Sequence, residues 1–197
     1  MVWAMIVYRR RKGETGLPAQ LRYNMPIEIL FTVIPFILII GLFALTARDE
    51  AVIEQRFDNP DVTIQAFGKQ WAWDFNYVKE DVYSSGIQVQ PDQVTKDKAD
   101  MPVLHLPVNE PVQLDLSSRD VVHSFWVPTF LFKRDVMPYP EANHSQSRFQ
   151  VTNLTEGSYV GRCAEMCGTY HSMMNFEIRV VSAEDFKTYL QARISGK

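Results

Sequence analysis

The chain has 197 residues, which is enough for one domain of ordinary size and a membrane anchor. Hydrophobic residues make up 46% of it, but they are concentrated in a few segments rather than spread evenly. The formal net charge is −3, slightly acidic, and we expect no nucleic-acid partner.

Residues 1–24 combine a short apolar segment with a basic loop. Met1 to Tyr8 is apolar but too short to cross a membrane, and its basic flank lies on the C-terminal side, opposite to that of a signal peptide. We therefore expect it to be the end of a first transmembrane helix that begins upstream, so that the natural protein forms a helical hairpin in the membrane.

Residues 25–48 are predicted to form a transmembrane helix. No charged residue occurs from Ile29 to Ala47, and with the residues that lead in, the apolar run is about 20 residues long, the length that spans a bilayer. A buried core helix is the alternative, but such a helix is rarely so uniformly apolar. The formal charges of residues 1–24 sum to +4, and those of the remaining chain sum to −7. The positive-inside rule therefore makes the loop cytoplasmic and residues 49–197 an external domain.

Glu28 is the one ionisable residue at the start of this apolar run. A carboxylate in the first turn of a helix complements the helix dipole. An ionisable group at the inner edge of a membrane can also belong to a proton path. The residues alone leave both interpretations open.

The external domain alternates short strand-like runs with polar turns. Many short strands bounded by turns favour an antiparallel sandwich or barrel. The segment 68–75 contains Trp71, Trp73 and Phe75, which a strand would place on one face as a core stripe. The other runs with alternating polarity are 62–67, 112–116, 149–151, 157–162 and 175–181.

Two further segments of this domain differ from the strands. Residues 77–101 are rich in polar residues and are predicted to form an exposed hairpin or loop, with one plausible strand at 87–89. Residues 183–194 are predicted to form a closing amphipathic helix. Ser182 is its expected N-cap and Asp185 completes a capping box. Its apolar stripe consists of Phe186, Tyr189, Leu190 and Ile194.

Metal-ligand chemistry is concentrated between residues 163 and 174. Cys163, Cys167, His171 and Met174 supply soft and borderline ligands suited to copper, and His123 can add a second imidazole. Two thiolates four positions apart on a curled loop can both bridge two copper ions, each of which then needs one imidazole. The axial positions fall to Met174 and to the backbone carbonyl of Glu165. The Glu165 carboxylate would project away, free for a hard cation such as Mg²⁺.

Simpler interpretations of the same residues remain. The two cysteines could form a disulfide, since an external domain permits one, or they could be the redox pair of a copper chaperone. Neither explains why a histidine and a methionine follow at fixed short offsets. The methionines Met166 and Met173 are expected to pack rather than bind metal. His105 and His144 lie outside the pattern and are expected to be ordinary surface or core histidines.

The pattern C-x-E-x-C-G-x-x-H-x-x-M, with D-V-V-H-S-F upstream, closely resembles the binuclear copper (CuA) motif of cytochrome c oxidase subunit II, bacterial type, in the heme-copper oxidase family. The likeness covers nearly the whole chain. It implies a cupredoxin-like Greek-key barrel and a magnesium ion held by Glu165 at the interface with subunit I. The implied ligands of the two copper ions are His123, Cys163, Glu165, Cys167, His171 and Met174.

The resemblance also implies roles for residues outside the ligand set. In Q-W-x-W, Trp71 would be the surface residue that receives electrons, while Trp73 packs. Glu28, seven residues before the helix proline Pro35, would lie at the mouth of a proton path in subunit I. Electrons would leave the copper centre by way of His171.

The chain has no additional membrane histidines that could hold hemes, so oxygen chemistry must lie in a partner. The resemblance supplies subunit I, with heme a and a heme a3–CuB centre, which reduces oxygen to water and pumps protons. Electrons would come from a c-type cytochrome, and the complex would lie in the lipid of a bacterial cell membrane as a multi-pass assembly. Asp120 matches an acidic position of the family. Arg119 replaces an acidic residue common in mitochondrial-type members, which favours a donor held in a larger assembly.

Three competing functions stand beside this one. A copper-delivery protein would bind one exchangeable ion. A metal-free scaffold subunit, as in quinol oxidases, would lack the ligand set that this chain retains. Nitrous-oxide reductases carry a similar dicopper domain but add a large second domain that is absent from this sequence.

Overall fold

The computed structural model describes residues 1–17, 20, 22–88, 101–142 and 147–196. The chain divides into two compact units, Met1–Ile53 and Glu54–Lys197. Each unit is described by itself below.

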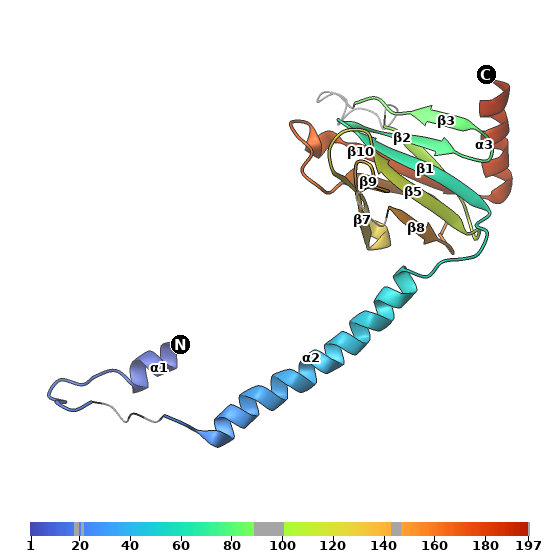
Figure 1. Ribbon diagram of the computed structural model, residues 1–197. Coiled ribbons are helices and arrows are strands. Elements are labelled where there is room, and N and C mark those ends of the chain that lie inside the picture. The colour runs from blue at the N-terminus through green and yellow to red at the C-terminus, as the bar shows by residue number, and fades with distance from the viewer. Residues whose placement is uncertain (18–19, 21, 89–100, 143–146, 197) are drawn as a thin grey trace. The chain divides into compact units, whose positions relative to one another are not determined.

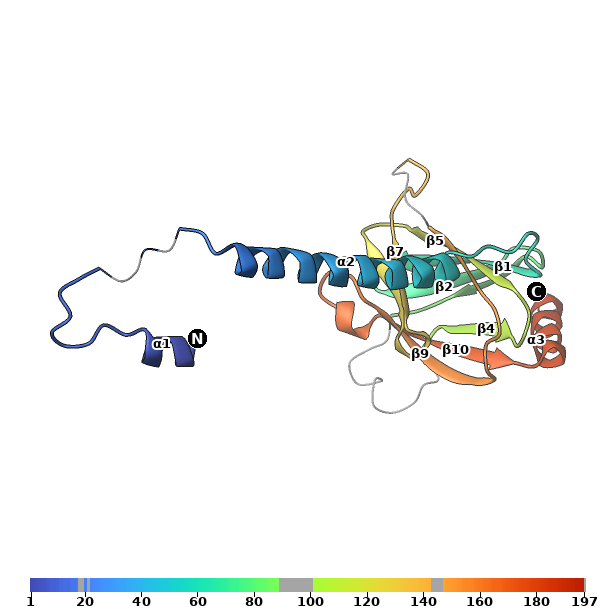
Figure 2. The same ribbon diagram turned by 90° about the horizontal axis from the view of Figure 1, so that it is seen from below.

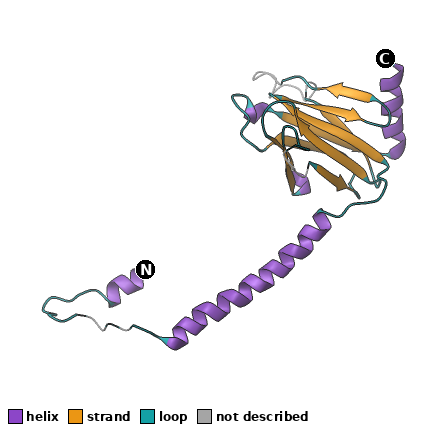
Figure 3. Cartoon of the chain, in the orientation of Figure 1, coloured by secondary structure: helices purple, strands orange, loops and turns teal. Residues whose placement is uncertain are grey.

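The first unit contains the short helix α1 (Val2–Val7) and the long helix α2 (Met25–Ile53). Among the described residues, α2 is the helix that is long and apolar enough to cross a membrane. It begins where the sequence predicted and continues beyond Arg48 as one unbroken helix (Figure 3). At its start, the Asn24 amide donates to Glu28 Oε1 at 3.0 Å, and the Ile27 amide donates to Asn24 Oδ1 at 3.4 Å. These two bonds satisfy backbone groups that a helix start leaves unpaired.

The second unit is a sandwich of two five-stranded sheets (Figure 1). The first sheet has the order β3-β2-β1-β5-β8 and the second β4-β10-β9-β6-β7. The first consists of β1 (Val62–Lys69), β2 (Ala72–Tyr77), β3 (Val82–Ser85), β5 (Val112–Ser118) and β8 (Arg148–Val151). The second consists of β4 (Val103–Pro107), β6 (His123–Val127), β7 (Phe132–Val136), β9 (Gly157–Cys163) and β10 (Asn175–Val181).

Strand pairing follows a Greek-key pattern in which non-consecutive strands become neighbours. Most pairs are antiparallel, but β1 pairs with β5 and β4 pairs with β10 in parallel. Along β1 and β5 every second residue is buried, because side chains of a strand point alternately to the two faces. The predicted cupredoxin-like barrel, with a membrane-type helix before it and a short helix after it, is confirmed. The two parallel pairs are the departure from a purely antiparallel sheet.

The core between the sheets is built around an aromatic cluster. The ring centroid of Trp73 lies 5.7 Å from that of Phe125 and 5.3 Å from that of Phe176, and those two phenylalanines are 4.7 Å apart. Gly161 on β9 lies directly under this cluster, because a Cβ there would fall 2.0 Å from Phe176 Cζ. The glycine therefore makes room for the ring that joins the two sheets.

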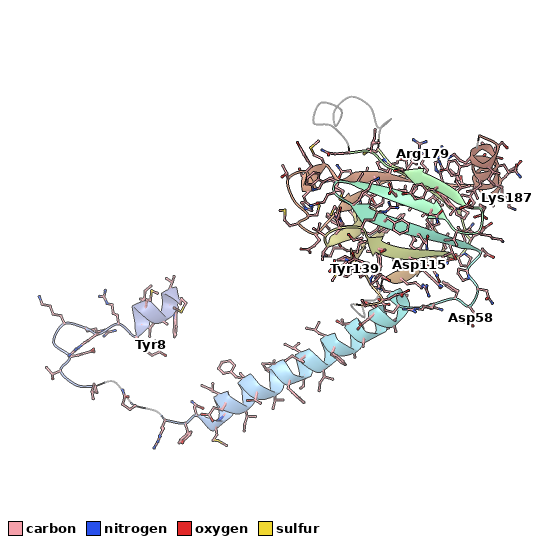
Figure 4. All side chains as sticks on the ribbon, turned by 45° about the horizontal axis from the view of Figure 1, so that its top comes forward. Tyr8, Asp58, Asp115, Tyr139, Arg179 and Lys187 are labelled. Atoms are coloured by element: carbon pink, nitrogen blue, oxygen red, sulfur yellow. The ribbon has the colours of Figure 1, made fainter. Side chains whose placement is uncertain are left out.

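Helix α3 (Ala183–Ser195) closes one end of the sandwich, beside β3 and β4 (Figures 1 and 2). Ser182 is its N-cap as predicted, since Ser182 Oγ accepts from the Asp185 amide at 3.1 Å. The Asp185 carboxylate accepts from the Ser182 hydroxyl rather than from its backbone amide. Phe186 and Leu190 are buried, whereas Ile194 stays 47% exposed. Lys187, and Arg179 on β10, project outward (Figure 4).

The segment 77–101 differs in part from its prediction. Tyr77 is fully buried in the core, and β3 forms a hairpin with β2, so the hairpin belongs to the sheet. The strand predicted at 87–89 is wrong for Ile87 and Gln88, which lie in no strand, and Val89 is outside the described residues. His144 is outside them as well.

Candidate metal centre

The two cysteines lie at one end of the sandwich. Cys163 is the last residue of β9, and Cys167 follows on the loop that leads to the short 3-10 helix η3 (His171–Met173). Both are free thiols and both are buried. Their sulfur atoms are 3.8 Å apart, much longer than a disulfide bond of about 2.05 Å.

Each sulfur faces one imidazole nitrogen. Nδ1 of His123, the first residue of β6, lies 3.8 Å from Cys163 Sγ, and Nδ1 of His171 lies 3.6 Å from Cys167 Sγ. The thioether sulfur of Met174 lies 3.8 Å from Cys167 Sγ and is fully buried. The structure thus brings together five of the six predicted ligands through their side chains.

The sixth predicted ligand, Glu165, meets the same cluster through its backbone. Its carbonyl oxygen lies 3.3 Å from Cys163 Sγ, as expected for a carbonyl that faces inward. The Glu165 side chain is half-buried.

This donor set fits copper. The ligand atoms of His123, Cys163 and Cys167 all lie within 4.8 Å of one another. Sulfurs 3.8 Å apart can each lie about 2.3 Å from a common ion, which is the length of a zinc–thiolate bond. Thiolate, imidazole and thioether together favour copper over hard cations.

The thiols and imidazoles influence one another's protonation. Burial alone would raise the pKa of Cys163, but hydrogen bonds from His123 and from backbone groups lower it to about 6. Burial and the neighbouring Cys163 sulfur raise the pKa of Cys167 to about 12. Burial would lower the pKa of His123, yet Cys163 and Asp120 raise it above its ordinary value. The thiols and imidazoles of the site are thus coupled, and a metal ion bound here would displace protons from them.

His123 is oriented by groups that the sequence did not identify as part of the site. Its Nε2 lies 2.8 Å from Asp120 Oδ1, which fixes Nδ1 toward the sulfur. Gly68 on β1 packs against the ring, and a Cβ there would lie 2.8 Å from His123 Cδ2. The acidic residue three positions before the histidine was a usable signal for Asp120, but the sequence carries no signal for the contact with Gly68.

Trp71 lies in the turn between β1 and β2, directly against the cysteine loop. Its indole Nε1–H donates to the Cys167 carbonyl at 3.1 Å, and its ring meets Tyr170 edge to face at 5.0 Å. Trp71 is only partly buried, whereas Trp73 is fully buried. This is the difference predicted from the sequence, with Trp71 at the surface and Trp73 packed in the core. Gln70 donates to the same carbonyl at 2.8 Å, a contact that the sequence did not indicate.

Arg119 lies on the rim beside this turn. Its guanidinium is 3.5 Å from the carboxylate of Asp74 and packs over the ring of Phe67 at 4.9 Å. Asp74 is fully buried and also pairs with Lys69 at 2.7 Å. Burial would raise the pKa of Asp74, but Lys69, Tyr83 and Ser85 hold it below its usual value. The two cations on the rim therefore share one buried anion.

The remaining residues lie outside this cluster. Met166 is 73% exposed, so the prediction that it packs is wrong, while Met173 is half-buried. His105 is half-buried and stacks on Tyr189 with centroids 3.9 Å apart, which agrees with an ordinary core histidine. Glu28 belongs to the first unit, where its carboxylate accepts from the Asn24 amide.

Comparison with known proteins places these features in a family. The family model described as cytochrome c oxidase subunit II, periplasmic domain, matches residues 62–181, more than half of the chain. The cytochrome c oxidase subunit 2 of Mycobacterium tuberculosis is 39% identical, over 99% of this chain and 66% of the relative. The probable subunit 2 of Nocardia farcinica is 36% identical, over 99% of this chain and 65% of the relative. The chain therefore spans slightly less than two thirds of these relatives.

A solved structure resembles the second unit. It is the periplasmic domain of subunit II of cytochrome oxidase from Bradyrhizobium japonicum, with a TM-score of 0.60 and 26% sequence identity. The match covers 72% of this chain and 99% of that domain. The likeness of fold thus extends over the strands that carry the sulfur and imidazole cluster.

Proposed function

The chain belongs to the cytochrome c oxidase subunit II family, and from that premise we propose that it is the electron-transfer subunit of a membrane heme-copper oxidase. The observation that carries the proposal is the meeting of two thiols, two imidazole nitrogens and a thioether at neighbour distances of 3.6 to 3.8 Å. These donors suit two copper ions that share both sulfurs.

In this proposal the sulfurs of Cys163 and Cys167 and one nitrogen each of His123 and His171 would hold two copper ions. The thioether of Met174 and the carbonyl of Glu165 would complete the set of donors. When bound, such a centre accepts and releases single electrons. The protein contributes rigidity. The ligands lie on β6, at the end of β9 and on the loop before β10, and these three strands are joined by hydrogen bonds. A rigid ligand set reduces the rearrangement that each electron requires.

Trp71 is the proposed point at which electrons arrive. Its indole is one hydrogen bond from the carbonyl of Cys167, so it connects the surface directly to a ligand residue. The proposed donor is a c-type cytochrome. Among the described residues of this rim, the carboxylate of Asp74 is paired with Lys69 and Arg119, and that of Asp120 is paired with His123. A basic cytochrome would gain little from these two carboxylates, and a donor held in a larger assembly suits this part of the rim.

Electrons would leave by way of His171 toward heme a in subunit I, where a heme a3–CuB centre would reduce oxygen to water and couple the reaction to proton pumping. Glu165 would hold a Mg²⁺ ion at the interface with subunit I through its carboxylate. Glu28 would mark the mouth of a proton path, in addition to its contact with the helix start.

The proposed location is a bacterial cell membrane, with further oxidase subunits and lipid around the anchor. Residues 1–24 would comprise the end of a first transmembrane helix and a cytoplasmic loop, residues 25–48 the second transmembrane helix, and residues 49–197 the copper domain on the extracytoplasmic side. This arrangement makes the protein multi-pass.

The test is to purify the full chain in detergent, count copper atoms per chain and record the EPR spectrum. We expect two coppers that share one unpaired electron. A single ion that exchanges readily with a chelator would support copper delivery instead. A chain that folds but binds no copper would indicate a scaffold subunit.

A further inference from the structure

We propose that Gln70 is a positioning residue that ties together the two separate chain segments that carry the copper ligands. One segment is the turn 118–123, which ends in His123, and the other is the loop 163–174, which carries the remaining ligands. The inference rests on the proposed function, because it assumes that these residues hold copper.

The side chain of Gln70 binds the second segment. Its Nε2 donates to the Cys167 carbonyl at 2.8 Å, and the indole of Trp71 donates to the same oxygen at 3.1 Å. Two donors thus occupy both lone pairs of a carbonyl that belongs to a ligand residue. The next residue, Gly168, has a φ of +120°, and a Cβ there would lie 3.1 to 3.3 Å from Trp71 and Gln70. The loop bends at a glycine where these two side chains lie against it.

The backbone of Gln70 binds the first segment. Its amide donates to Asp120 Oδ2 at 2.7 Å, and the other oxygen of that carboxylate lies 2.8 Å from Nε2 of His123. One residue is therefore linked through Asp120 to an imidazole ligand and through a carbonyl to a thiol ligand. The bonds run from His123 to Asp120, from Asp120 to Gln70, and from Gln70 to Cys167.

The hydrogen bonds of Gln70 reach both segments, which distinguishes it from its neighbours in the turn. The two segments are also joined by strand pairing, since β6 pairs with β9 and the Ala164 amide donates to the Ser124 carbonyl at 3.1 Å. That pairing holds the Cys163 end of the loop, and Gln70 bonds four residues further on, at Cys167. The direct contact between ligand side chains of the two segments, that of Cys163 Sγ with His123 Nδ1 at 3.8 Å, is much weaker than an amide hydrogen bond to a carbonyl. Gln70 thus preorganises the ligand set before copper binds, and it holds Trp71 on the same carbonyl.

The first test compares Gln70→Met with wild type in the purified full chain. Methionine has nearly the same length but no donor, so it removes the bond to Cys167 and keeps all copper ligands. We expect two coppers still to bind, with affinity lowered roughly tenfold in competition with a chelator, the usual scale for residues that support metal ligands. Gln65→Met is the matched control, since Gln65 lies on β1, the strand that leads into this turn, and bonds to Asn76 instead. Its copper affinity should stay within about twofold of wild type.

A second readout does not depend on copper. In the metal-free chain, the Nε1–H resonance of Trp71, assigned by its absence in Trp71→Phe, should exchange with solvent faster in Gln70→Met than in Gln65→Met. A purely structural glutamine would lower the unfolding temperature and leave this resonance as protected as in wild type.

The link between the two segments is tested by adding Asp120→Asn. If Gln70 links the segments in addition to the pairing of β6 with β9, breaking either bond already removes that link, and the double variant should lose less affinity than the product of the two single losses. Losses that multiply, or unchanged affinity in Gln70→Met, would overturn the inference. If Gln70→Met does not fold, Gln70→Asn, whose amide is one methylene too short, takes its place with the same expectations. A wild-type chain without two coppers would refute the proposed function instead.

Discussion

The two ends of the β-sandwich each hold a histidine whose surroundings are opposite in kind. At the end with the cysteines, His123 is fully buried, bound to Asp120 and directed at a thiol, and its pKa is raised. At the end closed by α3, His105 stacks on Tyr189, its Nδ1 has no hydrogen-bond partner among the described residues, and its pKa is lowered to about 4. Burial lowers the pKa of both imidazoles, and their polar neighbours decide whether the net shift is upward or downward.

The difference teaches how a ligand can be distinguished from a packing residue. His123 has one nitrogen fixed by a carboxylate, so the other is presented to the site with a defined tautomer. His105 is held instead by its stack on the ring of Tyr189. The variants below are expected to alter one end of the domain while sparing the other.

The largest effect is expected from Cys163→Ser or Cys167→Ser, because a serine oxygen does not replace a bridging thiolate. Either change should abolish the EPR signal of a shared electron completely, while the folded β-domain, held by the other end and the core, remains. His105→Phe at the opposite end is the control and should leave the spectrum unchanged. A cysteine variant with the wild-type spectrum would contradict the bridging arrangement.

The success of sequence reasoning also differs between the two ends. The ligand residues were identifiable because thiols, imidazole and thioether at short fixed offsets form a local pattern, and α3 was identifiable from its cap and apolar stripe. The roles of Gln70 and Gly68 were not, because they arise when β1 meets segments about 50 and 100 residues away. Such contacts depend on strand order, which alternating polarity does not encode.

Local patterns succeeded only in part where a polar segment joins a sheet. The residues from Tyr77 onward were predicted to form an exposed hairpin or loop because Asp, Lys, Gln and Ser dominate there. β3 nevertheless pairs with β2 at the sheet edge, where one face of a strand remains in solvent and tolerates polar residues. Tyr77 and Val82 supply the buried side of that hairpin.

Among these substitutions, the largest loss of folding stability is expected from one in the core between the two sheets. Gly161→Ala would place a methyl group 2.0 Å from Phe176 Cζ. The ring lies in the aromatic cluster between the two sheets and cannot easily move away. We expect the free energy of unfolding to fall by about 3 kcal/mol, at the upper end for an overpacked core. Gly196→Ala is the control, since its Cβ would meet nothing closer than 3.4 Å. Equal unfolding temperatures for the two variants would show that the core adapts.

His105 should make the stability depend on pH in the acid range. Its pKa is about 4 when folded, because burial and Arg179 oppose its charge while Glu177 only partly compensates, against 6.5 as its ordinary value. The unfolded chain therefore takes up a proton first, and stability falls as the pH drops from about 6.5 toward 4. His105→Phe keeps the stack on Tyr189 and removes the proton site. Between these pH values, wild type should lose about 1 to 2 kcal/mol more than the variant, measured by thermal unfolding.

The smallest change is expected from Met174→Leu at the copper end. Leucine nearly conserves the buried volume, so the fold should lose less than about 1.5 kcal/mol, and the thiolates and imidazoles still hold the metal. The variant lacks the weak thioether donor, so the oxidised copper centre is stabilised less than in wild type. The reduction potential should therefore rise, by no more than about 60 mV for a tenfold change in a one-electron equilibrium. Met166→Leu, at a methionine that is 73% exposed, should not move the potential. A shift in Met166→Leu but not in Met174→Leu would mean that the wrong methionine has been assigned to the copper centre.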